Sequence, residues 1–269
     1  MFCESLNITR DAYYKMRLRE YQKSEMRSKV LDIVTDRRKV LPREGGRKLL
    51  KAIAEELRDN DVIIGRDKFF DLLRENKLLV RPKKRYVRTT NSMHRFRKYP
   101  NLIKETKVTR PNQIWVSDIT YIRLTKGHCY LALITDAYSR KIVGYDISDS
   151  LELAGCLRAL KRALRQLPVN NNLIHHSDRG VQYCSYQYTD LLKRHKIGIS
   201  MTEENHCYEN AIAERVNGIL KDEFYLDHCF DNTRNAVKAS KSAVELYNNK
   251  RLHLSLNYKT PNMVHKKVA

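Results

Sequence analysis

The order of segments after Pro111 limits the fold of this chain more than any other feature of its sequence. Residues 111–230 read as three strands followed by a helix, a strand, a helix, a strand and a helix, at 114–124, 130–138, 141–148, 152–167, 172–178, 185–196, 197–202 and 208–224. The first three are rich in β-branched and aromatic residues and are joined by short turns, which predicts an antiparallel meander. The whole order predicts an α/β fold in which a mixed five-stranded sheet is flanked by helices.

Two aspartates interrupt this sheet at positions where a charge needs a reason. Asp118 lies inside the first strand, within an otherwise apolar run. A carboxylate there is costly unless it is paired or binds a cation. Asp178 ends the fourth strand, where the loop at Arg179 and Gly180 can open to a substrate. Both aspartates are therefore candidate functional residues.

A third acid, Glu214, lies on the last helix of this region. Ile212, Val216, Ile219 and Leu220 form the apolar stripe of that helix. Glu214 lies on a different face of the helix, which it shares with three polar residues at helical spacing: Asn210, Asn217 and Lys221. The pattern predicts that Glu214 points away from the main core.

Other titratable residues have plainer explanations. Four glutamates compete with Glu214 for the third position: Glu203, Glu204, Glu209 and Glu223. Asp136 precedes a turn and is expected to form a structural pair with Arg140. His176 is expected to form hydrogen bonds in the core, and Trp115 to pack there.

The charge balance points to a polyanionic partner. The formal net charge is +21, and residues 1–110 contain 30 Lys and Arg against 15 Asp and Glu. Nucleic acid best explains so strong an excess, while a merely basic surface and an anionic membrane remain alternatives. The six cysteines form no CxxC pair, which indicates reduced thiols rather than a disulfide framework. No apolar run is long enough to cross a bilayer, so a cytoplasmic location away from membranes is expected.

Residues 81–110 are interpreted as a basic linker. They hold 11 basic residues and one acidic residue and show little periodicity. Aromatic residues are interleaved with the charges, as in segments that contact nucleic-acid phosphates and bases. The predicted DNA contacts of this segment are Arg81, Lys83, Lys84, Arg85, Arg88, Arg95, Arg97 and Lys98.

Residues 1–80 are predicted to form a helical DNA-binding region. Two amphipathic helices within about 45–79, with Gly65 between them, match a helix-turn-helix. The second helix would enter a major groove with Arg66 and Lys68 at its start, and Arg47 on the first helix is a further predicted contact. Helical hairpins that bind no DNA share this spacing, so the pattern alone does not decide the role.

Several ordered motifs resemble one family. WVSDITYI, HSDRGVQY and ENAIAERVNGILKDEF, with Asp178 and Glu214 36 positions apart, resemble the DDE motifs of insertion-sequence transposases, relatives of retroviral integrases. The tail YNNKRLHLSLNYKTP and the segment GGRKLLKAIAEEL extend the resemblance over nearly the whole chain, toward the OrfB-type subunit of insertion-sequence group three. Glu209 and Leu252 depart from the family pattern without touching the three acids.

The resemblance implies a ribonuclease-H-like catalytic core over 111–230 and a C-terminal helical extension over 231–269. In the extension, four residues are expected either to dock the last helix or to bind DNA: Tyr247, Arg251, His253 and Tyr258. Asp118, Asp178 and Glu214 are the expected catalytic and metal-binding residues for two Mg²⁺ or Mn²⁺ ions, with Asp118 bridging both. Lys221 is an expected DNA contact.

The implied function is cleavage of double-stranded DNA at element ends, followed by attack of the freed 3′-hydroxyl on target DNA. Synapsis of two ends implies at least a homodimer, and the family's upstream OrfA product, as a separate subunit or a fusion, is a further expected partner in the bacterial cytosol or nucleoid. Two alternatives remain at this point. They are a non-catalytic DNA-binding regulator derived from a transposase and a ribonuclease-H-like nuclease that cuts without joining.

Overall fold

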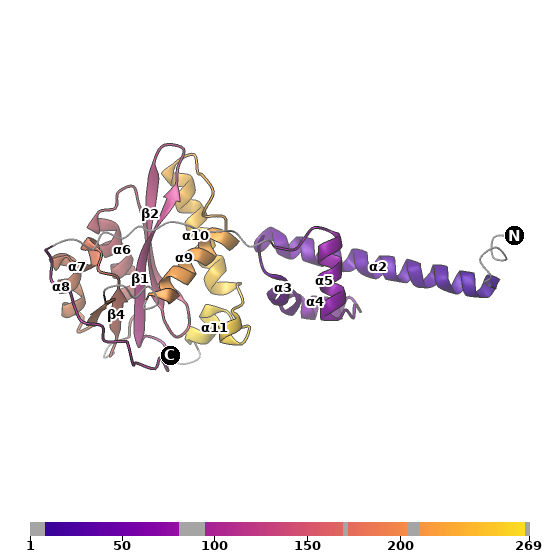
Figure 1. Ribbon diagram of the computed structural model, residues 1–269, viewed down its shortest axis with the longest axis horizontal. Helices are drawn as coiled ribbons and strands as arrows, with labels where there is room; N and C mark the ends of the chain where they lie inside the picture. The colour runs from indigo at the N-terminus through magenta and orange to yellow at the C-terminus, as the bar shows by residue number, and fades with distance from the viewer. Residues whose placement is uncertain (1–8, 81–94, 169–171, 204–209, 267–269) are drawn as a thin grey trace. The chain divides into compact units, whose positions relative to one another are not determined.

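The computed structural model describes residues 9–80, 95–168, 172–203 and 210–266. The chain divides into two units, Met1–Arg81 and Pro82–Ala269. The second unit has three layers, in which helices cover both faces of one sheet (Figure 1). This is the α/β core that the segment order predicts.

A mixed sheet of five strands lies at the centre of the second unit. Its strands are β1 (Ile114–Arg123), β2 (His128–Asp136), β3 (Ile142–Ser148), β4 (Ile174–Ser177) and β5 (Gly198–Met201). They lie in the order β3-β2-β1-β4-β5. The first three pair antiparallel, whereas β1 with β4 and β4 with β5 pair parallel. The predicted meander and the mixed sheet are confirmed.

Helices follow the strands in the predicted order. The second unit contains α6 (Leu153–Leu164), α7 (Val181–Cys184), α8 (Tyr186–Arg194), α9 (Ala211–Glu223), α10 (Thr233–Asn249), the 3-10 turn η1 (Leu254–Leu256) and α11 (Pro261–Lys266). The short α7 begins three residues after Asp178, so the chain turns sharply where β4 ends. Asp178 therefore lies just beyond the carboxyl end of β4, in the loop that follows this strand.

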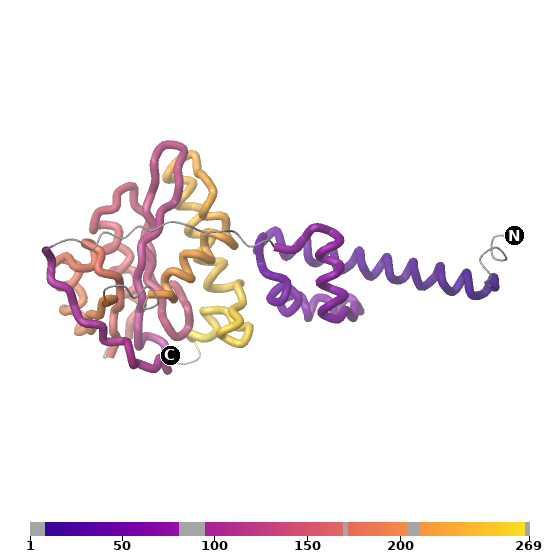
Figure 2. The backbone as a smooth tube through the Cα atoms, viewed as in Figure 1, coloured from indigo at the N-terminus to yellow at the C-terminus, as the bar shows by residue number. Residues whose placement is uncertain are grey.

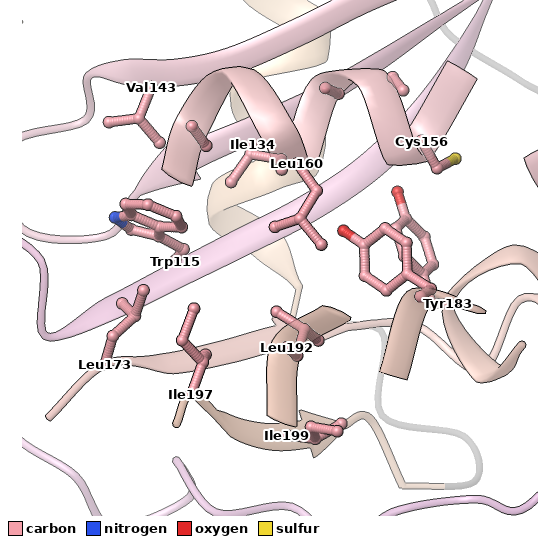
Figure 3. Packing of buried hydrophobic residues seen from close by; sticks show 14 of the residues in the cluster. Trp115, Ile134, Val143, Cys156, Leu160, Leu173, Tyr183, Leu192, Ile197 and Ile199 are labelled. Atoms are coloured by element: carbon pink, nitrogen blue, oxygen red, sulfur yellow. The ribbon is translucent and has the colours of Figure 1, made fainter. Parts of the chain in front are cut away.

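One face of the sheet packs against α6 and α8. Trp115, Ile134 and Leu160 belong to the buried cluster on this face, which Figure 3 shows from close by. The helix α6 approaches β3 closely, because a Cβ on Gly144 would lie 2.3 Å from the carbonyl oxygen of Ala159. Small side chains on both elements make this approach possible.

The opposite face of the sheet packs against α9 and α10. Leu133 points to this side and contacts a buried cluster that includes Val216, Leu220 and Tyr247. Alternate residues of the strands thus serve two cores. Since Asp118 alternates with Trp115 and Ser117 along β1, its side chain lies on the α9 side, where Val116 packs with Ala213.

The C-terminal segment is docked on the sheet by buried polar side chains. Arg251 donates two hydrogen bonds, of 2.8 and 2.6 Å, to the carboxylate of Glu223. The hydroxyl of Tyr247 donates to the carbonyl of Arg140 at 3.0 Å. His253 is also buried. Docking therefore accounts for these members of the predicted set, whereas Tyr258 is half-buried.

Asp136 and Arg140 interact through a backbone hydrogen bond of 2.9 Å and through the attraction of their charges, but no salt bridge joins their side chains among the described residues. The carboxylate of Asp136 instead accepts hydrogen bonds from the amide of Asn112 and from the amide and hydroxyl of Ser139. His265 of α11 lies 3.7 Å from it. These bonds outweigh the desolvation of the buried carboxylate and hold its pKa below the usual range. The role is structural, as expected, but the side-chain partners are different.

Part of the segment interpreted as a linker contacts the sheet unit. Phe96 and Tyr99 pack against the α6-side core, and the amide of Leu102 donates to Ser200 at 2.9 Å. Residues 95–110 thus lie along the second unit, while residues 81–94 lie outside the described residues.

The first unit is all-helical. It contains α2 (Arg10–Val40), α3 (Gly46–Ala52), α4 (Ala54–Asp59) and α5 (Arg66–Glu75). Its core joins the end of α2 to the shorter helices through residues such as Val34, Leu49 and Phe69. Figure 2 shows α2 continuing well beyond the three shorter helices. The segment 45–60 forms two helices interrupted at Ile53, rather than one. Among the described residues, no helix is long and apolar enough to cross a membrane.

Candidate active site

The register of two parallel strands brings Asp118 and Asp178 together. Ser117 of β1 pairs with Ser177 of β4. Each aspartate directly follows one of these two paired serines, and the charge of Asp178 acts on Asp118 strongly enough to raise its pKa. Parallel strands in register turn corresponding side chains to the same face. Two residues that are distant in sequence are therefore adjacent in the fold.

Each oxygen of the Asp118 carboxylate has one hydrogen-bond donor within the protein. The backbone amide of Ile119 donates to Oδ1 at 2.9 Å, and Nδ2 of Asn217 donates to Oδ2 at 2.7 Å. The Oδ1 of Asp178 accepts from the amide of Gly180 at 3.0 Å. Hydrogen bonds to charged oxygens fix their orientation and leave further lone pairs for a ligand.

Helix α9 carries Glu214 to the same face of the sheet. The helix lies against β1, to which Asn210 and Asn217 donate hydrogen bonds. Glu214 occupies the first turn and its side chain is exposed. The prediction that this face of the helix differs from the apolar stripe is confirmed. Two of its members are buried against β1 rather than solvated, which helical spacing alone did not indicate.

The three acids influence one another electrostatically. The pKa of Asp118 is raised to about 7, mostly by burial and further by the negative charges of Asp178 and Glu214, while the hydrogen bonds from Ile119 and Asn217 partly offset this rise. The charge of Asp178 also contributes to the raised pKa of Cys156. The site thus concentrates negative charge that a bound cation would neutralise.

The donor set fits a hard divalent cation. Carboxylate oxygens are the ligands that Mg²⁺ and Mn²⁺ prefer, and the charge near Asp118 is not offset by an ion pair with a lysine or arginine among the described residues. Within residues 9–80, 95–168, 172–203 and 210–266, no three Asp, Glu, His or Cys side chains are gathered closely enough to hold one ion. Asp118 and Asp178 directly follow the last paired residues of the β1–β4 ladder, and the charges of Asp178 and of the exposed Glu214 both act on Asp118.

A buried hydrogen-bond network lies directly behind the two aspartates. The Nε2 of His175 is 2.7 Å from the hydroxyl of Ser117 and 3.0 Å from the hydroxyl of Tyr188. Burial lowers the pKa of His175 to about 3, so the imidazole is neutral. The network links β1, β4 and α8 immediately before Asp118 and Asp178. The sequence analysis did not identify it, because its members are 58 and 13 positions apart.

The competing acids are engaged elsewhere or lie outside the described residues. Glu223 is held by Arg251. Glu203 forms an ion pair with Lys104 at 3.5 Å. Glu204 and Glu209 lie outside the described residues. His176 forms the expected core hydrogen bond, 2.8 Å from the hydroxyl of Ser200. Trp115 is fully buried, as predicted.

A pocket of about 750 Å³ opens beside the loop that follows Asp178. Val181 and Gln182 of α7 form one wall, and Leu151 and Glu152 form another. Gln182 donates to the carbonyl of Leu151 at 2.7 Å and so joins the two walls. This pocket could not be predicted from sequence patterns, because its lining comes from separate segments.

The predicted DNA contacts are mostly exposed where the structure describes them. Exposed side chains are those of Arg47, Arg66, Lys68, Arg95, Arg97 and Lys98, and Lys221 is half-buried. Arg66 contacts the carboxylate of its neighbour Asp67 at 2.9 Å. Arg81, Lys83, Lys84, Arg85 and Arg88 lie outside the described residues.

Comparisons with known proteins agree with this architecture. Two family models, both described as Integrase core domain, match residues 108–207 and 195–261. The chain is 35% identical over 265 residues to a 31 kDa protein of insertion element IS600 from Shigella sonnei, which covers 96% of this chain and 95% of that protein. It is also 35% identical over 180 residues to the transposase for insertion sequence element IS904 from Lactococcus lactis, which covers 66% of this chain and 70% of that protein.

A solved structure matches the fold at low sequence identity. It is a chain of the simian T-cell lymphotropic virus intasome in complex with PP2A regulatory subunit B56 gamma. The TM-score is 0.51 at 17% identity, over 75% of this chain and 67% of the matched chain. This likeness concerns the arrangement of strands and helices.

Proposed function

Because this chain belongs to the insertion-sequence transposases with an integrase core domain, we propose that it cuts DNA at the ends of an insertion sequence and joins the freed 3′-hydroxyl to a second DNA site. It is an enzyme of the polynucleotidyl transferase type. Cutting and joining would use the same three acids, since each step replaces one phosphodiester oxygen by another.

The observation that carries this proposal is the register of β1 and β4. Pairing of Ser117 with Ser177 sets Asp118 and Asp178 side by side, and the hydrogen bonds of α9 to β1 bring Glu214 to the same face. The charges of Asp178 and Glu214 both raise the pKa of Asp118, which supports a common site for the three acids. A purely structural role would not require three acids to act on one another in this way.

Asp118, Asp178 and Glu214 would hold two Mg²⁺ or Mn²⁺ ions. Such ions, when bound, activate the attacking oxygen and stabilise the departing one. Asp118 would contribute to holding both ions, because the charges of Asp178 and Glu214 both act on it. The exposed Glu214 would complete the set when DNA and cations are present.

Basic residues around the core and on the first unit would bind the DNA backbone. Arg95, Arg97 and Lys98 are exposed beside the sheet unit, and Lys221 follows Glu214 on α9. Arg47, Arg66 and Lys68 are exposed on the helical unit, near the starts of α3 and α5, where helix N-termini favour phosphates. The segment 81–94 would add Arg81, Lys83, Lys84, Arg85 and Arg88.

The reaction on two element ends calls for at least a homodimer, in which each copy binds one end. An upstream OrfA-type subunit, separate or fused, would take part in end recognition. Bacterial cytosol or nucleoid is the compartment in which such an enzyme meets its DNA.

The test is an assay of the full chain with Mg²⁺ and labelled DNA that carries the ends of the element. Cleaved and joined products are measured for the wild type and for Glu214→Gln, which keeps the shape of the side chain and removes its charge. The proposal predicts joining by the wild type and none by the variant. Cleavage without joining would support a simple nuclease, and binding without chemistry would support a regulator.

A further inference from the structure

We infer that Asn217 is a positioning residue of the active site, whose amide orients the carboxylate of Asp118 for cation binding. The inference rests on the proposed function, because it assumes that Asp118 is a metal ligand. It assigns a defined task to a residue that does not itself react.

The contact between Asn217 and Asp118 is short and shielded from water. Asn217 is 6% exposed, and its Nδ2 donates to Oδ2 of Asp118 at 2.7 Å. The amide of Ile119 holds the other oxygen of the same carboxylate at 2.9 Å. With one donor on each oxygen, the carboxylate has a single favoured orientation. Loss of the Asn217 bond would leave that orientation to the repulsion from the neighbouring acids.

A second asparagine fastens the same helix to the same strand. Asn210 is 5% exposed and its Nδ2 donates to the carbonyl of Ser117 at 3.1 Å. The backbone carbonyl of Asn210 accepts a hydrogen bond from the backbone amide of Glu214 at 3.1 Å. The two asparagines therefore bind successive residues of β1 from positions that flank Glu214 on α9. This arrangement fixes the position of Glu214 along the direction of β1, as well as the orientation of the Asp118 carboxylate.

Each of the two asparagine side chains has a buried acceptor atom, its Oδ1. Among the described residues, the Oδ1 atoms of Asn210 and Asn217 have no hydrogen-bond partner although they are buried. A buried amide oxygen is normally satisfied. Mg²⁺ and Mn²⁺ keep several of their waters when they bind to proteins. The O–H groups of such waters match the Oδ1 of Asn217, which lies on the same amide that contacts Asp118.

Asn248 provides a matched control within the same unit. It is 8% exposed and joins α10 to β3 by two hydrogen bonds of 3.0 Å to the backbone of Ile142. Like Asn217, it is a buried asparagine that links a helix to the sheet. Both bonds are to backbone atoms, and neither involves an acid. Its replacement should loosen the fold without changing a cation site.

The test measures Mn²⁺ binding to the full chain by electron paramagnetic resonance, with thermal unfolding recorded on the same samples. We compare the wild type with Asn217→Leu, which has similar volume and no amide, with the smaller Asn217→Ala, and with Asn248→Leu. The expected result is a Mn²⁺ affinity about 10- to 100-fold weaker in both Asn217 variants, the range typical of lost partners behind metal ligands. Asn248→Leu should keep the wild-type affinity within about 2-fold, even though it melts at a lower temperature.

Three outcomes would overturn the inference. Wild-type affinity in a folded Asn217 variant would show that the amide does not position the site. Equal weakening in Asn248→Leu would show that the loss reports a loosened fold. Absence of Mn²⁺ binding by the wild type would overturn the cation site of the proposed function and this inference together. The first two outcomes would overturn the inference alone and leave the proposed function standing. If Asn217→Leu does not fold, Asn217→Ala decides between these outcomes.

Discussion

The helical unit and the sheet unit use their polar residues in opposite ways. In the helical unit, residues expected to bind DNA, such as Arg66 and Lys68, are exposed and lie outside the apolar core around Phe69. In the sheet unit, polar residues next to the proposed site, such as Asn217 and His175, are buried. Exposed basic residues of the first unit can therefore be replaced with little effect on its folding. In the second unit, replacing a buried polar residue would disturb both the proposed site and the fold.

The largest expected effect is on activity alone, at Glu214. Because the Glu214 side chain is exposed, Glu214→Gln should leave the melting temperature unchanged while removing a metal ligand. Loss of a charge that stabilises the transition state costs about 10²- to 10³-fold or more in rate. Strand transfer, measured on labelled DNA ends, should fall at least that far. A variant that retained half of the wild-type rate would exclude Glu214 from the catalytic set.

The next prediction compares the α6-side core of the sheet unit with the core of the helical unit. Trp115→Ala should cost about 3–5 kcal/mol, because it empties a fully buried site on the α6 side of the sheet. Phe69→Ala should lower the stability of the helical unit by a similar amount. Calorimetry should show that each substitution moves a different unfolding transition. A single transition that moves in both variants would contradict the division into two units.

A smaller effect is expected from the charge of Asp118. Its pKa is raised to about 7, so the native state holds a proton that the unfolded chain releases near the ordinary aspartate pKa of 3.8. Stability should therefore fall as the pH rises from about 4 to 7 and stay low above that range. In the presence of a chelator, Asp118→Asn should raise the melting temperature at pH 8 by several degrees more than at pH 5.

Asp146 is the matched control for that experiment. Its buried carboxylate is paired with Arg158 at 2.7 Å and Arg162 at 3.1 Å. Asp146→Asn should lower the melting temperature at pH 8, because it leaves two cations without their partner. If both variants gained stability, burial rather than unpaired charge would explain the Asp118 result.

The smallest effect is expected on the helical unit. Arg66→Ala and Lys68→Ala should each weaken binding to double-stranded DNA by about 2- to 10-fold and reduce its salt dependence by about one counterion. Thermal stability should change by less than about 0.5 kcal/mol, since both side chains are exposed. Filter binding at several salt concentrations measures the slope. An unchanged slope would remove these residues from the DNA interface.

Much of the sheet unit could be predicted because its signals are local. Strand and helix patterns follow the burial of alternate or every third to fourth residue, and the order of these segments fixes the topology. Asp118 was conspicuous because a charge in an apolar strand needs compensation. The position of Glu214 followed from helical spacing. Each of these inferences uses only neighbours in sequence.

The contacts that orient the acids could not be predicted in the same way. The hydrogen bond between Asn217 and Asp118 joins residues 99 positions apart, and that between Asn210 and Ser117 joins residues 93 apart. Helical spacing placed both asparagines on the face of Glu214, but it does not tell which strand that face meets. The choice of partner depends on how α9 packs on β1.

The long helix α2 lies within the region predicted to be helical, but its bounds were not predicted. An apolar stripe appears only near its end, at residues such as Val30 and Val34. Its earlier turns carry exposed apolar residues such as Tyr21 among many charges, and they are supported by pairs such as Lys15 with Asp11. A helix that buries little has no periodic apolar pattern to reveal it.

The most direct test of the account is the location of a bound cation. Crystals of the full chain soaked in Mn²⁺ would be measured at the manganese absorption edge, where anomalous scattering marks the ion. We expect an anomalous-scattering peak between the carboxylates of Asp118 and Asp178, with Glu214 close by. A peak at other residues, or none at these two aspartates at saturating Mn²⁺, would contradict the assignment of the active site.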